Sequence, residues 1–327
     1  MATILVTGGA GYIGSHACKL LAAAGHEPVV FDNLRTGWRA AVKFGPLIEA
    51  DLLDRDAIGA AMADVKPDAV MHFAALSNVG ESTARPDLYW RNNAVGSLNL
   101  LDAMADVGVN ALVFSSTCAV YGMAQGAVLD EDHPCAPINP YGASKLTVER
   151  MIADYAALGA LKSVVFRYFN VAGADPDAEI GEHHEPETHL VPLTLDAVAG
   201  DRAALTVNGD DYDTPDGTCI RDYLHVMDLA DAHVRGIDHL LGGGDALTLN
   251  LGTGTGFSVR EVMDAATAVT GIKTPYNIGP RRIGDPPRLV SGSDRAYAAL
   301  GWVPKRSNMN DMIGDAWRWR ATGLYRT

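Results

Sequence analysis

The sequence of 327 residues predicts an α/β fold, with a doubly wound parallel sheet and a second, smaller mixed α/β substrate domain. Along the first half of the chain, short apolar runs rich in β-formers alternate with stretches of helical length. Elements that alternate in this way build parallel sheets, and right-handed crossovers place the helices on both faces. A glycine-rich turn after the first strand and an aspartate at the end of the second strand agree with this fold.

The first domain is predicted to span residues 1–170. Its strands are expected at residues 3–7, 28–31, 69–73, 111–115 and 163–167. Its helices are expected at residues 14–24, 56–63, 93–107 and 140–158.

The second domain is predicted to span residues 171–327. Residues 174–189 are polar and acidic and contain Asp-Pro and Glu-Pro steps, which favours a loop. Further helices are expected at residues 224–241, 260–270 and 311–320, and a strand at 246–251. The elements around 224–251 are expected to return to the first domain.

The composition favours a globular cytoplasmic protein. The net charge of −14 argues against binding to nucleic acid or to a membrane surface. Four scattered cysteines give no disulfide framework and indicate a reducing compartment. The N-terminus lacks the features of a signal peptide, and no apolar run approaches the ~18 residues of a spanning helix.

The turn after the first strand predicts a dinucleotide site. Gly8, Gly11 and Gly14 have a G-x-x-G-x-x-G spacing between a strand and a helix, so a pyrophosphate can approach the helix N-terminus. Asp32 lies 32 − 14 = 18 residues beyond Gly14, close to the ~20 expected for the adenosine-ribose ligand. An acidic residue there favours NAD over NADP. The pattern is typical of a Rossmann-type NAD site.

Two further segments face the same crevice. Asp51 follows a short apolar run and is interpreted either as a ligand of the adenine amino group or as a helix cap. Phe73, Ala74 and Ala75 follow the next strand, where the carboxyl ends of parallel strands border the cofactor.

A Tyr-x-x-x-Lys pair predicts the catalytic base. Tyr141 and Lys145 lie four residues apart and therefore on one face of a helix. A free phenol ionises near ~10, but an adjacent ammonium and a positive nicotinamide ring favour the phenolate. Ser115, Ser116 and Thr117 end a strand, where a hydroxyl can reach the same point and share the proton.

Seven motifs, in this order, resemble the UDP-glucose 4-epimerase family of extended short-chain dehydrogenases/reductases. They are TGGAGYIGSH, HFAA with VGES, FSSTCAVYG, PYGASK, RYFNVAGA, RDYLHVMDLADAH and RRIGD. The set covers nearly the whole chain.

The resemblance implies roles for individual residues. Tyr141 is the base, Lys145 its pKa partner and ribose ligand, and Thr117 the hydroxyl that shares the proton. The implied NAD contacts are Gly8, Gly11, Tyr12, Ile13, Gly14, Asp32, Asn33, Asp51, Leu52, Phe73, Ala74, Ala75, Asn93, Ser115, Tyr141, Lys145 and Tyr168. The implied substrate contacts are Thr117, Tyr141, Phe169, Asn170, His189, Leu190, Arg221, Arg282 and Asp285.

The resemblance further implies reversible C4 epimerisation of UDP-galactose and UDP-glucose through a 4-keto sugar, by a homodimer paired through the helices at 93–107 and 140–158. The sequence departs from the family at Ser77, where many members have lysine, and at His189, where asparagine is frequent. Leu289 occupies the position associated with room for an N-acetyl group, and it is of intermediate size.

Other reactions stay open. UDP-GlcNAc/GalNAc, UDP-xylose/arabinose and UDP-uronate 4-epimerases would use the same mechanism, and a catalytically silent NAD-binding protein would lack the Tyr or Lys present here. A 4,6-dehydratase is disfavoured because Cys118 and Ala119 stand where such enzymes have Asp-Glu. No metal site is predicted: His183, His184, His189, Glu185 and Glu187 fit no standard zinc spacing and are interpreted as a solvated loop.

Overall fold

The computed structural model describes residues 1–123, 128–159, 161–282 and 285–324. Its main sheet has seven strands in the order β11-β6-β5-β4-β1-β2-β3, all paired in parallel. The strands are β1 (Thr3–Thr7), β2 (Glu27–Asp32), β3 (Leu47–Glu49), β4 (Ala69–His72), β5 (Ala111–Ser115), β6 (Lys162–Tyr168) and β11 (Leu247–Leu251). The predicted fold class is confirmed.

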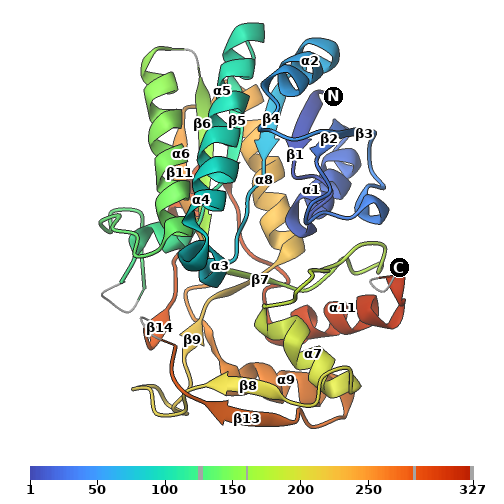
Figure 1. Cartoon of the computed structure of the whole chain (residues 1–327), viewed down its shortest axis with the longest axis vertical. Coiled ribbons are helices and arrows are strands. Elements are labelled where there is room, and N and C mark those ends of the chain that lie inside the picture. Colours follow the sequence, from blue (N-terminus) through green and yellow to red (C-terminus); the bar gives the residue numbers. More distant parts are fainter. Residues whose placement is uncertain (124–127, 160, 283–284, 325–327) are drawn as a thin grey trace.

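Helices cover both faces of this sheet (Figure 1). One face carries α1 (Tyr12–Ala23) and α8 (Val226–Leu241), and the other carries α2 (Arg55–Val65), α5 (Gly96–Val107) and α6 (Pro140–Ala157). Strand order reverses between β1 and β4, and a crevice forms outside the carboxyl ends of strands at such a switch point. The fold therefore provides a cofactor crevice next to the glycine turn.

Short elements connect the sheet strands. Between β2 and β3 lies the turn η1 (Arg39–Ala41), and after β5 the turn η3 (Cys118–Tyr121). The segment after β4 forms α3 (Val79–Ala84), α4 (Pro86–Tyr89) and the wider helical turn η2 (Trp90–Val95), which runs into α5. The predicted helix at 93–107 thus begins as a wider turn and becomes regular at Gly96.

A second region lies below the sheet in Figure 1. Its helices are α7 (Leu190–Ala199), α9 (Val259–Thr270) and α11 (Met309–Ala321). Its small sheets contain β7 (Asn170–Ala172), β8 (Leu205–Asn208), β9 (Ile220–Arg221), β10 (Tyr223–His225), β12 (Phe257–Ser258), β13 (Tyr276–Gly279) and β14 (Arg288–Leu289). The helix α10 (Asp294–Leu300), although late in the chain, packs against β11 and α8 of the first region.

The helix predicted at 224–241 starts two residues late. Tyr223–His225 pairs with β7 as strand β10, and the His225 side chain then accepts from the N–H of Met227 and caps α8. The capping imidazole explains where the chain changes from strand to helix.

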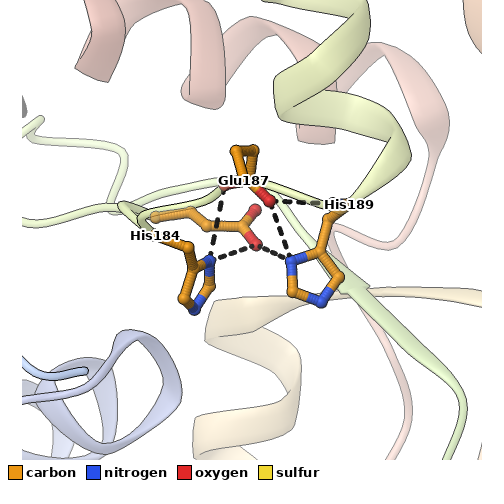
Figure 2. Close-up of side chains that lie close together, drawn as sticks. His184, Glu187 and His189 are labelled. Atoms are coloured by element: carbon orange, nitrogen blue, oxygen red, sulfur yellow. Dashed lines mark hydrogen bonds and ion pairs between the residues drawn. The ribbon is translucent and has the colours of Figure 1, made fainter. Parts of the chain in front are cut away.

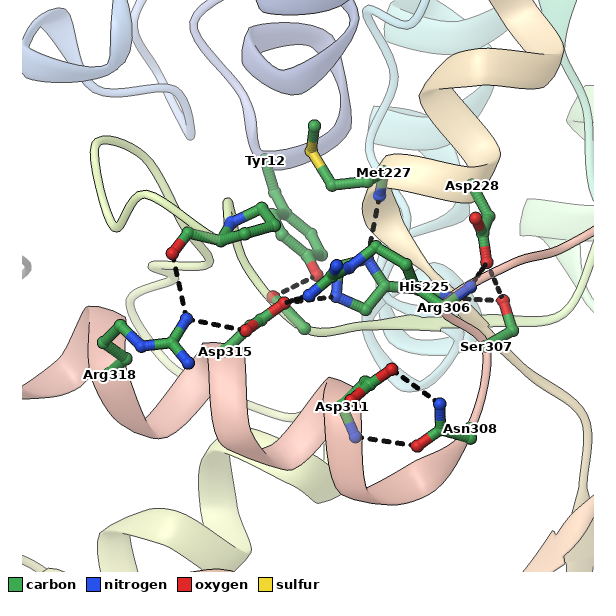
Figure 3. Close-up of polar contacts among 12 residues, drawn as sticks. Tyr12, His225, Met227, Asp228, Arg306, Ser307, Asn308, Asp311, Asp315 and Arg318 are labelled. Atoms are coloured by element: carbon green, nitrogen blue, oxygen red, sulfur yellow. Dashed lines mark hydrogen bonds and ion pairs between the residues drawn. The ribbon is translucent and has the colours of Figure 1, made fainter.

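Polar contacts fasten α11 to α8 and β10 (Figure 3). Asp315 of α11 accepts from His225 Nε2 at 3.1 Å, Arg306 Nη2 at 2.7 Å and Arg318 Nη1 at 2.8 Å. Burial opposes ionisation, but these three donors outweigh it and lower the pKa of Asp315 to about 2. Asp228 of α8 accepts from the backbone N–H of Arg306 at 2.8 Å.

No helix among the described residues combines the length and the apolar character needed to cross a membrane.

Candidate active site

Close backbone contacts shape the glycine turn after β1. Gly8 has φ of +74°, and a Cβ atom there would lie 2.6 Å from the backbone nitrogen of Ala74. A Cβ atom at Gly14 would lie 2.2 Å from the carbonyl oxygen of Gly8. Side chains are therefore excluded at both positions, and the turn brings α1 close to the sheet.

The N-terminus of α1 is suited to a pyrophosphate. The helix begins with Tyr12, Ile13 and Gly14, its cap residue Gly11 contributes no side-chain hydrogen bond, and its first turn contains no acidic residue. The first N–H groups of a helix have no intrahelical partner and lie at the positive end of its dipole. The residues present thus fit the phosphates of NAD.

Asp32 is fixed beside the glycine turn at the end of β2. Its carboxylate is 7% exposed and accepts from the backbone N–H of Ala10 at 3.0 Å and of Leu34 at 2.8 Å. Next to it, the amide of Asn33 donates to Asp51 Oδ2 at 2.8 Å. The predicted adenosine ligands Asp32, Asn33 and Asp51 therefore form one edge of the crevice. Their contacts with ribose and adenine stay predictions.

Asp51 does not cap α2, so that interpretation is wrong. The cap is Asp54, whose side chain accepts from the N–H of Ala57, while Asp51 Oδ1 accepts from the N–H of Leu53 at 2.9 Å. Leu52 between them is buried in the core under α2 and α5.

The segment after β4 forms the opposite edge. The backbone N–H groups of Phe73 and Ala74 donate to the carbonyl oxygen of Thr7 at 2.9 and 3.1 Å, so this segment lies against the glycine turn. The ring of Phe73 packs 4.7 Å from that of His233, and Ala75 follows at half-buried exposure.

Asn93 connects the segment after β4 to α6 through side-chain hydrogen bonds. Its Oδ1 accepts from the N–H of Leu76 at 2.8 Å, and its Nδ2 donates to the carbonyl oxygen of Leu76 at 3.0 Å and to Ser144 Oγ at 3.1 Å. The side chain is 1% exposed. The structure thus gives Asn93 a positioning role beside the cofactor crevice.

The predicted catalytic hydroxyls meet at the carboxyl edge of the sheet. α6 begins with Pro140 at its first position and with Asn139 as its cap, and this start places Tyr141 in the first turn. The Thr117 hydroxyl lies near that of Tyr141. Burial raises the pKa of Tyr141, and the neighbouring Thr117 hydroxyl opposes this rise.

Lys145 lies one turn further along α6. It is 3% exposed, its Nζ donates to the carbonyl oxygen of Ser115 at 2.7 Å, and it lies 4.9 Å from the ring centre of Phe114. Burial lowers the pKa of its ammonium to about 7, and the charge of Glu149 opposes the shift. The Ser115 hydroxyl bonds that of Tyr168, so the predicted residues of β5, β6 and α6 converge.

Glu149 is a site residue that sequence reasoning missed. Its carboxylate pairs with the buried Arg167 of β6, through a 3.0 Å bond from Nε and a second contact from Nη2, and it accepts from Ser116 Oγ. Glu149 therefore anchors the strand end that carries Thr117. The signal was available, because Tyr141, Lys145 and Glu149 form a continuous i, i+4, i+8 series.

On the substrate side, Arg221 and Asp285 form an ion pair. Arg221 also donates to the carbonyl oxygens of Ile220 at 2.6 Å and of Pro286 at 2.9 Å. Leu289 of β14 lies opposite Arg221 of β9 in the strand register. The position that the family associates with room for an N-acetyl group therefore lies beside the predicted diphosphate ligand. Residues 283 and 284 of the RRIGD motif lie outside the described residues.

The remaining predicted contacts come from several elements. Asn170 starts β7, and its Nδ2 donates to the carbonyl oxygen of Asp222 at 3.3 Å. Arg282 Nη2 and Nε lie 3.2 Å from the amide oxygen of Asn208, once that amide is oriented to accept. Phe169, directly after β6, and Leu190, the first residue of α7, are both half-buried.

His189 contacts two glutamates of its own loop, and its predicted contact with the substrate stays a prediction. Its Nδ1 lies 2.9 Å from Glu182 Oε1 and 3.1 Å from Glu187 Oε1, so this nitrogen is engaged within its own loop. Ser77 is exposed between β4 and α3.

The fold and this site define a class of protein. The model of the NAD dependent epimerase/dehydratase family matches residues 4–252, and the chain belongs to that family. Within it, the chain is 52% identical over 319 residues to the UDP-glucose 4-epimerase of Rhizobium leguminosarum bv. trifolii, covering 98% of this chain and 97% of that protein.

Solved structures agree. The UDP-glucose 4-epimerase of Brucella ovis in complex with NAD superposes with a TM-score of 0.95 at 47% identity, covering 97% of this chain and 98% of that one. The UDP-glucose-4-epimerase of Stenotrophomonas maltophila, with bound NAD and formylated UDP-arabinopyranose, superposes with a TM-score of 0.96 at 41% identity and covers 100% of both chains.

Proposed function

We propose that this chain is an NAD-dependent isomerase that interconverts UDP-galactose and UDP-glucose at C4 of the hexose. The observation that carries the proposal is the convergence of Tyr141, Thr117 and Lys145 at the carboxyl edge of the sheet. Lys145 lies in the same helix, and the glycine cradle of the cofactor lies across the same edge of the sheet. This arrangement combines a proton acceptor with a redox cofactor.

Tyr141 accepts the proton of the sugar 4-hydroxyl, and Thr117 holds that proton in a shared bond. NAD held at the turn of Gly8, Gly11 and Gly14 would supply a reversible hydride acceptor for C4 and would be unchanged over the whole cycle. Tyr141 returns the proton after the keto sugar has presented its other face. Burial of Tyr141 disfavours its phenolate, and the neighbouring Thr117 hydroxyl favours it.

Arg221 and Arg282 are proposed to bind the diphosphate, since a planar guanidinium matches phosphate oxygens. Asp285 is proposed to bind the uridine ribose. The existing pair of Arg221 and Asp285 keeps both groups oriented before substrate arrives. The nucleotide then holds the substrate while the sugar turns.

Other UDP-sugars form the second candidate. Leu289 beside Arg221 leaves more room than a tyrosine and less than a small residue, so N-acetylated sugars and pentoses belong in the first assay.

We further propose a cytoplasmic homodimer that pairs through α5 and α6. Apolar side chains on η2 and in the first turn of α5 support this, since Trp90, Val95 and Leu98 are 40%, 46% and 38% exposed. Light scattering of the purified protein tests it, with a mass of one chain as the contradicting result.

The deciding experiment incubates the purified protein with UDP-galactose and follows UDP-glucose in a coupled assay, with UDP-GlcNAc and UDP-xylose in parallel. Tyr141→Phe removes the proton acceptor and is expected to abolish turnover while NAD and UDP still bind. Tyr155→Phe is the matched control, because Tyr155 lies on the same helix and bonds Asp102 away from the site.

Turnover of another UDP-sugar alone would keep the mechanism and change the substrate. Full activity in Tyr141→Phe, or no turnover of any UDP-sugar by the wild type, would contradict the proposal.

A further inference from the structure

Four side chains converge in the loop before α7, although the sequence indicated only a solvated segment. They are Glu182, His184, Glu187 and His189, and their ligand atoms all lie within 4.8 Å of one another (Figure 2). The side chains of Glu182 and Glu187 are only 6% and 14% exposed. Two buried carboxylates that face each other need positive charge between them.

The distances within the cluster are close to the edge lengths of a tetrahedral ion site. His184 Nδ1 lies 3.4 Å from Glu182 Oε1 and 3.4 Å from Glu187 Oε2, and the corresponding distances from His189 Nδ1 are 2.9 and 3.1 Å to Glu182 Oε1 and Glu187 Oε1. Zinc–ligand bonds of about 2.0–2.2 Å give tetrahedron edges of about 3.3–3.6 Å. Both His184 contacts fall within that range, and the two His189 contacts would have to lengthen by about 0.2–0.7 Å to reach it.

His184 points into the cluster without a hydrogen bond. Its Nδ1 is buried, is equidistant from the two carboxylates, and has no hydrogen-bond partner among the described residues. An imidazolium paired with one carboxylate would approach it to about 2.8 Å. Equal, longer distances are those expected of a nitrogen that shares a central ion with both carboxylates.

A second acidic cluster provides a contrast. Asp175, Asp177 and Glu179 also lie close together, but Lys19 Nζ occupies their centre at 2.7, 2.9 and 2.7 Å. Within the described ranges, the recorded ion pairs of Glu182 and Glu187 involve histidines and no lysine or arginine. Among the described residues, the carboxylates of the first cluster are therefore balanced only by the histidines of the cluster itself.

Hydrogen bonds and a pocket next to the four side chains also support the binding of an ion. Glu187 Oε1 accepts from the N–H groups of Thr188 at 2.7 Å and His189 at 2.8 Å, which fixes the carboxylate as outer-shell bonds do in metal sites. A pocket of about 150 Å³, lined by Glu182, His184 and Glu187 among others, gives access.

We propose that Glu182, His184, Glu187 and His189 bind one divalent zinc ion in a tetrahedral N₂O₂ site. Two carboxylates and two neutral imidazoles neutralise a doubly charged ion and match its ligand preference. The ion connects the loop before α7 with the start of α1, since the rings of Tyr12 and His184 meet at right angles with centroids 6.4 Å apart. The site is structural and does not depend on the proposed epimerase reaction.

The test uses tag-free, full-length protein that has been stripped with a chelator and then titrated with zinc sulfate against a chromophoric zinc chelator. We expect one equivalent to bind, and we expect Tm to rise by roughly 5–10 °C at zinc a thousandfold above Kd. His184→Gln and Glu187→Gln should weaken binding at least ~100-fold, since even outer-shell partners contribute about 10–100-fold. The neighbouring His183→Gln, outside the four-residue set, should bind like the wild type.

Cobalt(II) in the wild-type protein keeps the test valid if a variant fails to fold. Intense visible absorption without a thiolate band supports the tetrahedral N/O site. A thiolate band would place the ion on a cysteine, and weak octahedral absorption or equal affinity in His184→Gln and the wild type would likewise overturn the proposal.

Discussion

The hydroxyl group of Tyr12 donates a 2.6 Å hydrogen bond to the carbonyl oxygen of Gly173. Tyr12 opens α1, whose N-terminus faces the cofactor crevice, and Gly173 is a buried residue of the segment that leads into the second region. One bond therefore links the start of α1, where the phosphates of NAD are predicted to bind, to the polypeptide that carries the loop before α7; Figure 3 labels Tyr12 in this region.

Tyr12→Phe is expected to lower the free energy of unfolding by about 1–3 kcal/mol, because it leaves a buried carbonyl oxygen without its donor. Urea denaturation measures this change. Tyr297→Phe is the control, since Tyr297 is 63% exposed and its loss should change stability by less than about 0.5 kcal/mol. Equal stability of the two variants would show that the Tyr12 bond is not a significant link.

Gly8→Ala is expected to abolish NAD binding. The added Cβ would lie 2.6 Å from the backbone nitrogen of Ala74, and the φ of +74° is unfavourable for alanine, so the turn must open. Cofactor content after purification and calorimetric titration with NAD measure the loss. Gly59→Ala in α2 meets no atom within 4 Å and should keep NAD binding and gain up to ~1 kcal/mol of stability.

Thr117→Val should reduce kcat by roughly 10²-fold or more, because it removes the hydroxyl that shares the Tyr141 proton. Since the Thr117 hydroxyl lowers the pKa of Tyr141, its loss raises that pKa and should move the acid limb of the pH–kcat profile to higher pH. Thr117→Ser keeps the hydroxyl and should retain both rate and profile. An unshifted acid limb in Thr117→Val would remove the hydroxyl from the proposed proton transfer.

Acid should destabilise the fold through buried neutral histidines. Burial lowers the pKa of His233 to about 4, and its bond to the carbonyl oxygen of Leu229 only partly opposes this; burial likewise lowers the pKa of His16 to about 4 and of His72 to about 3. An unfolded histidine takes its proton near ~6.5. Between pH 6.5 and 4 the unfolded state therefore binds more protons, and stability falls as pH falls.

The His233→Phe variant tests whether this buried histidine makes stability fall as pH falls. The ring packs against Phe73 and Phe166 at 4.7 and 4.9 Å, so phenylalanine fills the same space. The wild type should lose up to ~1.4 kcal/mol per pH unit relative to the variant below pH 6.5. Denaturation at pH 7.5, 6 and 5 measures the difference, and His239→Gln, on the same helix, should run parallel to the wild type.

Much of the parallel sheet could be predicted because its strands are buried on both faces and appear as continuous apolar runs. β1 coincides with its predicted range, and β4 and β6 differ from theirs only at the ends. The two-residue strands β9, β12 and β14 could not be predicted, since they are stabilised by partners distant in sequence. The helix α7 was not predicted, because the polar segment before it was interpreted as a loop and the position where the helix begins was not recognised.

At the candidate site, local spacing located Tyr141 and Lys145 on one helix. The proximity of Thr117 to Tyr141 follows from the order of the strands, and the position of Asn93 follows from the wide helical turn after α4. Neither can be derived from local spacing in the sequence. Glu182 was overlooked beside three histidines, because the loop's path, and not its spacing, brings Glu182 to His184 and His189.

The order of the main sheet has a consequence for attempts to divide the protein. β11, from residues 247–251, pairs with the edge of β6, and α8 covers β5 and β6. A fragment that stops near residue 170 would present an unpaired strand edge and an uncovered apolar face, which are the features of chains that aggregate. The cofactor half is therefore not a transplantable module: gene fusions or split versions must carry both stretches of sequence that build its sheet.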